Sequence, residues 1–314
     1  MKFWFDKNHM IKKDSMIGIL IISLFLLAII VNQNPKPTKT DTTPTQTSLF
    51  PKDGIAILDL YGPIAFPQYS NGYMPMAANL TLEQLEQIRQ DSYVKGLLIR
   101  INSPGGTVAA SQEIYNSIKR IKKELNIPVV AQIGDVGASG AYYAALGADT
   151  IFANPGSLVG SIGVIIGNLS IHKLAEKHGI DYKVYKSGPY KDLLSMWRPS
   201  HEDEETLLQH VIDNVYEQFK QAFIESRQLT EKNASKLAQG QIYTGLQALD
   251  NQMIDQIGGY QDAITYLGEL TKLGKNPHII KKTNYGWKGI MNLLNNTLNV
   301  KHPYQLTNTI PTLY

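Results

Sequence analysis

The sequence predicts an α/β layered fold, in which strands and helices alternate along the chain. Short apolar runs that suit buried strands lie at residues 55–60, 94–101, 129–133 and 151–153. Segments with a helical spacing of apolar residues separate these runs. Such an alternation is typical of a sheet with helices packed on its faces. With 43% hydrophobic and 18% charged residues among 314, the chain can bury a sizeable core.

Each helical segment between the predicted strands has its own signal. Apolar residues at positions 82, 85 and 88 give residues 80–89 a helical spacing. Residues 108–125 are typical of a helix that must end before Pro128, and the small apolar residues 138–146 are compatible with another helix. Together, the strands and helices place the globular part of the chain at residues 54–275.

A long helix is predicted from residue 200 to about Arg227. Ser200 follows Pro199 and is a good N-cap residue, because its hydroxyl can accept a hydrogen bond from the first helical turn. Acidic residues occupy positions 202–205, where their charge suits the positive end of a helix. We therefore interpret this acidic cluster as part of the helix start rather than as a metal site.

Residues 16–31 form an apolar run that predicts a transmembrane anchor. The run is slightly shorter than the about 20 residues that span a bilayer, but flanking polar residues can extend it. Four lysines precede it within residues 1–15, and this favours a cytoplasmic N-terminus. Residues 32–53 are rich in Pro and Thr and predict an extended linker. The globular part is then expected on the extracytoplasmic side of the cell membrane.

Two other interpretations of residues 16–31 are weaker. A cleaved signal peptide needs small residues near its cleavage point, and the end of this run has none. A buried core helix is opposed by the lysines before the run and by the linker after it. At the other end of the chain, residues 276–314 form a basic extension, and residues 285–298 carry apolar side chains near one helical face. That segment suits either a membrane surface or a subunit contact.

The composition excludes several kinds of site. A net charge of +3 gives no general case for nucleic-acid binding. The absence of cysteine excludes disulfides, thiolate metal sites and a cysteine nucleophile. We expect no metal and no cofactor.

Ser139 lies among glycines and other small residues, in the run Gly-Ala-Ser-Gly-Ala-Tyr-Tyr of residues 137–143. These neighbours leave room for a substrate carbonyl to approach the serine hydroxyl. A Ser-Pro-Gly-Gly turn at residues 103–106 can direct backbone N–H groups at the oxyanion that would form. The two motifs together predict acyl transfer by a serine nucleophile.

The proton acceptor for this serine is not predicted to be a histidine. His172 and His178 do not share a helical face, and a β-lactamase-like arrangement lacks its middle motif. A lysine remains, although an ordinary lysine has a pKa of about 10.4 and is neutralised only by burial among apolar groups. Lys183, Lys186 and Lys191 lie in one segment, and spacing alone does not choose among them.

The chain carries five motifs in a fixed order. They are Arg-Ile-Asn-Ser-Pro-Gly-Gly (100–106), Gly-Ala-Ser-Gly-Ala-Tyr-Tyr (137–143), Asn-Pro-Gly-Ser (154–157) with Gly-Ser-Ile-Gly-Val (160–164), Lys-Ser-Gly-Pro-Tyr-Lys-Asp (186–192), and Ile-Tyr-Thr-Gly (242–245) with Ile-Asp (254–255). Over about residues 54–270 the chain thereby resembles the signal peptide peptidase A family of Ser-Lys membrane proteases. Gln241 departs from the family pattern, in which an arginine is common at that position.

By motif, the resemblance implies that Ser139 is the nucleophile and Lys191 the general base. It implies that Ser161 is the hydroxyl that holds the lysine amine. It also implies that the backbone N–H groups of Gly106 and Gly140 form the oxyanion hole. The fold implied is like that of the Clp protease subunit and the crotonases, with stacked ββα units.

The surroundings of Lys191 bear on its protonation. If residues 190–192 are extended, Lys191 and Asp192 point to opposite faces of the chain. The neighbouring acid then need not hold the lysine in its charged form.

The function implied by the resemblance is that of a membrane-tethered endopeptidase, which degrades remnant signal peptides after signal peptidase has released them. Because the chain has one copy of the family's unit, a homo-oligomer is implied, in which Ser and Lys of one site can come from neighbouring subunits. Two alternatives are a crotonase-type enzyme acting on acyl-CoA and a noncatalytic membrane scaffold. Labelling of Ser139 by a fluorophosphonate would separate the protease from both.

Overall fold

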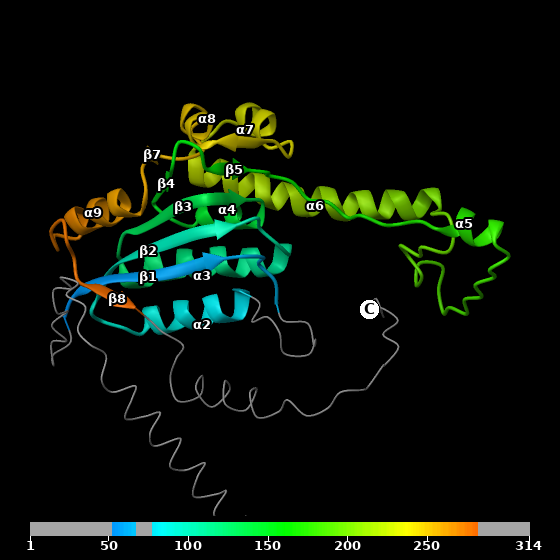
Figure 1. Ribbon diagram of the computed structural model, residues 1–314, viewed down its shortest axis with the longest axis horizontal. Coiled ribbons are helices and arrows are strands. Elements are labelled where there is room, and N and C mark those ends of the chain that lie inside the picture. The colour runs from blue at the N-terminus through cyan, green and yellow to red at the C-terminus, as the bar shows by residue number, and fades with distance from the viewer. Residues whose placement is uncertain (1–51, 67–76, 282–314) are drawn as a thin grey trace, which may run out of the picture. The chain divides into compact units, whose positions relative to one another are not determined.

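The computed structural model describes residues 52–66 and 77–281, which include one sheet (Figure 1). Its strands are β1 (Gly54–Tyr61), β2 (Val94–Ser103), β3 (Val129–Ala138), β4 (Thr150–Ala153), β5 (Leu158–Gly160), β6 (Ile242–Thr244), β7 (Gln256–Ile257) and β8 (Ile279–Lys281). The strand order is β6-β5-β3-β2-β1-β8, and β4 pairs with β3 and β7. The pairs are parallel except for β5 with β6.

Helices connect most of these strands. They are α2 (Ala77–Arg89), α3 (Val108–Leu125), α4 (Gly140–Ala145), α5 (His172–Lys177), α6 (Glu202–Arg227), α7 (Glu231–Leu237), α8 (Gly245–Asp250) and α9 (Tyr260–Leu270). The predicted strands and helices are found close to their expected positions, and the α/β class is confirmed.

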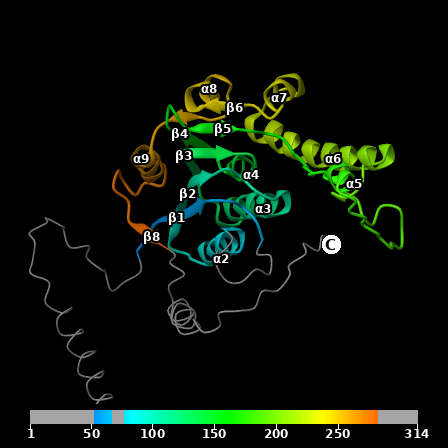
Figure 2. The same cartoon turned by 45° about the vertical axis from the view of Figure 1, so that its right-hand side comes forward.

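The sheet is buried on both faces, which explains why consecutive residues in the middle of its central strands are apolar, as at residues 97–99 of β2. Side chains of a strand alternate between the faces. In β2, Leu97 and Ile99 therefore belong to the large core on the side of α2 and α3, whereas Leu98 packs in the smaller core with Leu267 of α9. Figure 2 shows α9 on one side of the sheet and α2, α3 and α4 on the other.

Strand β3 extends to Ala138, beyond the predicted 129–133, and this extension positions the site. Its first half pairs with β4, and its second half, from Val136, pairs with β5. The chain then turns at Ser139 into α4, whose first residue is Gly140. The predicted helix over 138–146 is therefore present but starts two positions later, because Ala138 still belongs to the sheet.

The prediction that Ser200 caps the long helix is wrong. Helix α6 starts at Glu202, and His201 is its N-cap residue. The carboxylate of Glu204 accepts a hydrogen bond from the His201 N–H at 2.9 Å, while the Ser200 hydroxyl donates to Glu205 at 3.0 Å. The acidic residues do contribute to the helix start, as expected, because Glu204 supplies the reciprocal bond of a capping box.

Several predictions lie outside the described residues. These are the cytoplasmic segment 1–15, the anchor 16–31, most of the linker 32–53 and the amphipathic segment 285–298. Within the described ranges, no helix has the length and apolar character needed to cross a membrane. Strand β8 belongs to the predicted extension 276–314, yet it pairs with β1, so the sheet continues past residue 275.

Candidate active site

The carboxyl ends of three neighbouring parallel strands meet at one place. The Ser103–Gly106 loop follows β2, Ser139 follows β3 and Ser161 follows β5. Strand register brings these ends level, since Ser103 pairs with Gly137 and Ala138 pairs with Gly160. Ligands commonly bind at the carboxyl ends of such strands.

Ser139 has a strained backbone. Its φ is 52° and its ψ is −126°, in a region that residues with a side chain rarely adopt. Such a conformation costs about 1–3 kcal/mol and persists where the surroundings enforce it. Here the Ser139 N–H donates to the Gly160 carbonyl at 2.8 Å, and its own carbonyl accepts from Tyr143 N–H at 2.9 Å. The turn leaves Ser139 partly exposed, with its side chain at the mouth of a cleft.

The glycines of the two motifs are in close contact. Gly105 has a φ of 96°, and a Cβ added there would lie 2.6 Å from Gly140 N and 2.8 Å from Ser139 Cβ. A Cβ added at Gly140 would lie 3.2 Å from Gly106 N. Only glycine permits this approach of the loop to the start of α4. Within the described ranges, neither the Gly106 nor the Gly140 amide donates to a side chain or to a loop carbonyl.

Ser161 directly follows β5, as Ser139 directly follows the neighbouring strand β3. Its φ is 51°, and its N–H donates to the Gln241 carbonyl at 2.7 Å. The residue at position 241 therefore supports Ser161 through its backbone, so the replacement of the common arginine by Gln241 leaves this bond in place.

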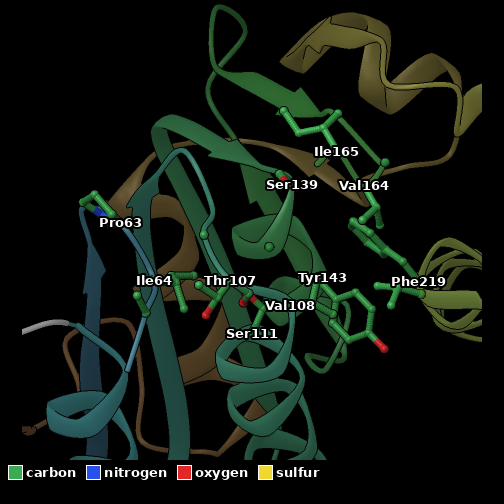
Figure 3. Close-up of a pocket in the computed structure, with 15 residues that line it drawn as sticks. Pro63, Ile64, Thr107, Val108, Ser111, Ser139, Tyr143, Val164, Ile165 and Phe219 are labelled. Atoms are coloured by element: carbon green, nitrogen blue, oxygen red, sulfur yellow. The ribbon is translucent and has the colours of Figure 1, made fainter. Parts of the chain in front are cut away.

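An apolar cleft of about 420 Å³ opens beside Ser139. Figure 3 shows Pro63 and Ile64 on one side of it and Tyr143 and Phe219 on the other. Val164 and Ile165, which follow β5, line it as well; the remaining lining residues are Ala65, Gly106, Thr107, Val108, Ser111, Gly140, Gly163 and Val215. Among these lining residues there is no lysine, histidine, aspartate or glutamate, so the cleft itself holds no strong base.

Lys191 lies in a turn rather than in the extended segment considered from the sequence. Its N–H donates to the Gly188 carbonyl at 3.2 Å, and Leu193 N–H donates to the Tyr190 carbonyl at 3.1 Å. The Lys191 side chain is exposed and has no hydrogen-bond or ion-pair partner among the residues in the described ranges. The carboxylate of the neighbouring Asp192 bonds Arg198 and Lys186 and not Lys191.

Asp192 is held by two cations. The Arg198 guanidinium donates to both its oxygens, at 2.9 and 2.8 Å, and the Lys186 amine donates at 2.6 Å. These hydrogen bonds, led by those from Arg198, hold the pKa of Asp192 well below its usual range. Of the three candidate lysines, Lys186 is thus engaged by Asp192, and Lys183 lies 3.9 Å from the carboxylate of Asp181. Lys191 is the one of the three that has no acid partner in the part of the chain that the structure describes.

A single chain does not bring Lys191 to Ser139. Residues 186–198 are called the Lys191 segment. Arg198, which bonds Asp192 within this segment, also donates to Glu204 in the first turn of α6, so the Lys191 segment is attached to the start of that helix. Phe219, which lines the cleft, lies about 22 Å further along the same helix at a rise of about 1.5 Å per residue. Figure 1 shows α5 and its neighbouring segments beside the start of α6, away from α4.

Sequence reasoning did not identify the aromatic wall of the cleft. Tyr143 lies one helical turn after Ser139, so its place on the same side of α4 could have been inferred from spacing. Phe219 had no such signal. It reaches the cleft because α6 packs on α4, with the Tyr143 and Phe219 ring centroids 4.6 Å apart.

Comparisons with known proteins agree with this architecture. The sequence profile of peptidase family S49 matches residues 121–274, and that of Clp protease matches residues 70–157. The expected Clp protease-like α/β domain is thereby confirmed.

Similar proteins occur in bacteria and plants. "Putative protease slr0021" of Synechocystis sp. is 42% identical over 192 residues, which are 61% of this chain and 68% of that protein. "Putative signal peptide peptidase SppA" of Enterococcus faecium is 40% identical over 61% of this chain and 56% of its own. "Serine protease SPPA, chloroplastic" of Arabidopsis thaliana is 32% identical over 73% of this chain and 34% of its own. The chain thus matches between about one third and two thirds of the length of these relatives.

Proposed function

Because this chain belongs to peptidase family S49, the signal peptide peptidase A family, it is a protease, and we propose that it is a serine endopeptidase with a Ser-Lys dyad. The observation that carries this proposal is the strained Ser139, held at the mouth of an apolar cleft beside two glycine amides. This is the arrangement that an acyl-transfer nucleophile and its oxyanion hole require.

In the proposed reaction, the Ser139 hydroxyl attacks the scissile carbonyl carbon and transfers its proton to the neutral amine of Lys191. The carbonyl oxygen becomes an oxyanion, which accepts hydrogen bonds from the N–H groups of Gly106 and Gly140. When the tetrahedral intermediate collapses, the C–N bond breaks and Lys191 returns the proton to the leaving amine. Water, deprotonated by the same lysine, then attacks the ester carbonyl; the bond to the Ser139 oxygen breaks, and the lysine returns the proton to that oxygen.

Ser161 is the proposed hydroxyl that holds the Lys191 amine. Support comes from its place directly after β5. Ala138 and Gly160 are paired in neighbouring strands, so Ser139 and Ser161, which follow them, leave the sheet at the same level. Hydrogen bonding to Ser161 would direct the amine without adding a negative charge that keeps it protonated.

The dyad is proposed to form between subunits of a homo-oligomer. Two observations support this: none of the described residues that line the cleft is a base, and the Lys191 segment is attached to the remote end of α6. Apolar side chains in the stretch that leads to Lys191 are exposed, Ile180 at 55% and Tyr185 at 94%, as a surface that meets another subunit would be.

The proposed substrates are remnant signal peptides, and the proposed location is the outer side of the cell membrane. Apolar, extended segments suit a cleft lined by Ile64, Val164 and Phe219. The name of the Enterococcus relative refers to the same class of peptide. A membrane anchor at residues 16–31 would keep the enzyme where such fragments are released.

The test uses the full chain with an apolar peptide and a fluorophosphonate probe. We expect Ser139→Ala to abolish peptide cleavage and labelling while the circular dichroism spectrum is unchanged. Full cleavage by this variant would refute the proposed nucleophile. Binding of an acyl-CoA thioester without any labelling of the wild-type chain would favour the crotonase-type alternative instead.

A further inference from the structure

Ser111 is a buried polar residue in the candidate active site that the proposed reaction does not use. It lies in the first turn of α3, is 1% exposed and lines the cleft (Figure 3). A serine in such a position must have its hydroxyl satisfied, since a buried hydroxyl without a hydrogen-bond partner destabilises the fold. Its partners therefore indicate what it does.

The Ser111 hydroxyl donates to the carbonyl of Thr107 at 2.9 Å, and the Ser111 N–H donates to the same oxygen at 3.1 Å. The backbone on the other side of Thr107 is bonded to Ile64. The Thr107 N–H donates to the Ile64 carbonyl at 2.8 Å, and Gly106 and Ile64 form an isolated parallel β-bridge. Thr107 is thus held on both sides: its N–H is bonded to Ile64, beyond the end of β1, and its carbonyl is bonded to Ser111 in the first turn of α3.

The same hydroxyl lies directly against Gly140. A Cβ built at Gly140 would collide with the Ser111 oxygen and would lie 3.1 Å from Ser111 Cβ. The next atom that this Cβ would meet is Gly106 N, at 3.2 Å. Ser111 therefore touches both elements that carry the proposed oxyanion donors, through Thr107 on one side and Gly140 on the other.

We propose that Ser111 is a positioning residue for the oxyanion hole, which sets the separation of the Gly106 and Gly140 amides. The inference rests on the proposed function, and it assigns Ser111 no contact with the substrate. Oxyanion donors act only when they lie about 2.7–3.1 Å from the developing charge. Loss of the Ser111 hydroxyl would remove one of the two hydrogen bonds to the Thr107 carbonyl and empty the space beside Gly140, so the two amides would no longer be held at one spacing.

The first experiment compares Ser111→Ala with the wild-type full chain in peptide cleavage. We expect kcat to fall by about tenfold or more with KM changed less than about twofold, because the oxyanion exists in the transition state and not in the bound peptide. Affinity for a peptide aldehyde, whose adduct places an oxyanion in the same hole, should fall by a similar factor. Ser117→Ala, the same change on the same helix outside the cleft, should leave both unchanged.

A second experiment exchanges the sizes of the two contacting residues. Gly140→Ala alone should lower kcat strongly, because its new methyl group meets the Ser111 oxygen. Combining it with Ser111→Gly removes the collision and should recover part of kcat. The two changes would then be non-additive, as expected for residues in direct contact.

The outcomes separate this inference from the proposed function. If the wild-type chain cleaves peptides and Ser111→Ala retains its kcat and aldehyde affinity, losing only thermal stability, Ser111 is a packing residue and the inference is refuted. If the double variant is no more active than Gly140→Ala, the contact does not set the hole and the inference is again refuted. A wild-type chain that neither cleaves peptides nor reacts with a fluorophosphonate would refute the proposed function, and the role of Ser111 with it.

Discussion

At the scale of single residues, Lys191 differs from its neighbours in having no acid partner among the described residues. A general base must be neutral when it accepts the serine proton, and arginine stays charged in proteins. We therefore predict that Lys191→Arg is as inactive as Lys191→Ala, each losing at least about a thousandfold in kcat. Initial rates of peptide cleavage measure this. A lysine base also requires wild-type activity to rise toward alkaline pH.

The matched control for Lys191 is Lys183→Arg, since Lys183 is an exposed lysine just before the Lys191 segment. It should retain wild-type activity. Substantial activity in Lys191→Arg would show that the site needs a positive charge there rather than a base.

Gly105 lies where the site has no room for a side chain. Its φ of 96° disfavours any side chain, and a Cβ would lie 2.7 Å from the Ala138 carbonyl as well as against Gly140. We predict that Gly105→Ala lowers kcat by about tenfold or more and lowers the melting temperature, because the loop must move away from the start of α4.

Gly156, a glycine with open space around it, provides the comparison for Gly105. A Cβ at Gly156 meets nothing within 4 Å, and its φ is not in the left-handed region. Gly156→Ala should therefore leave kcat and the melting temperature near their wild-type values. Equal effects of the two changes would contradict the close packing described for Gly105.

At the scale of elements, Arg198 attaches the Lys191 segment to α6. It donates to Asp192 and to Glu204, whose side chain is only 2% exposed. Hydrogen bonding from Arg198 is the main cause that lowers the pKa of Glu204 from 4.5 to about 2. Because the folded-state pKa is depressed, the stabilisation is complete above about pH 4.5 and is lost as the pH falls toward 2.

We predict that Arg198→Met loosens this attachment at neutral pH, since it leaves two carboxylates without their main partner. Limited proteolysis should cut between α5 and α6 faster than in the wild type, and the wild type should approach that rate as the pH falls below about 4.5. Arg89→Met provides the comparison, because Arg89 bonds exposed carboxylates of Glu86 and Glu124. Exposed pairs contribute little, so that variant should be cut at the wild-type rate.

At the scale of the whole molecule, the arrangement of α6 separates the two proposed catalytic residues within one chain. Mixed oligomers of Ser139→Ala and Lys191→Ala chains should therefore recover activity, because a site can combine an intact serine with an intact lysine from a neighbour. In an equal, random mixture, about half of the sites receive an intact serine and about half of those also receive an intact lysine, so about one quarter of the sites are complete. The measurement is peptide cleavage after the two variants are unfolded together and refolded.

The control for this mixture is each variant refolded alone, which should be inactive. Mixed oligomers that contain both chains, verified by two different affinity tags, and yet cleave no peptide would show that each chain supplies its own dyad.

Much of the fold could be predicted because its signals are local. The helix over 108–125 was expected from its apolar spacing and the following Pro128, and α3 has those bounds. The apolar run 94–101 became β2, a strand buried on both faces. The helix cap at residue 200 could not be assigned reliably. His201 is the cap because the reciprocal bond from Glu204 and the position of Arg198 select it, and these contacts depend on tertiary structure.

The site was predictable in a similar way. The glycine-rich surroundings of Ser139 and the turn at 103–106 lie at the ends of adjacent parallel strands, so motifs far apart in sequence converge as strands pair. The turn conformation at Lys191, the contact of Phe219 with the cleft and the place of Ser111 against Gly140 had no local signal. Each depends on how helices pack across the sheet.

The amino-acid sequence by itself determined the α/β alternation, the family and the motifs that converge on Ser139. It could do so because strand burial, helical spacing and the need for glycine act through the chain's own neighbours. The tertiary structure alone decided that no described residue lining the Ser139 cleft is a base, and that the Lys191 segment is attached to α6 at Glu204, about 22 Å along the helix from Phe219. The physical reason is that α6 is a rigid helix with one end packed on α4, while its other end bonds Arg198, so the relation of the two residues is set by packing over a distance that no local pattern records.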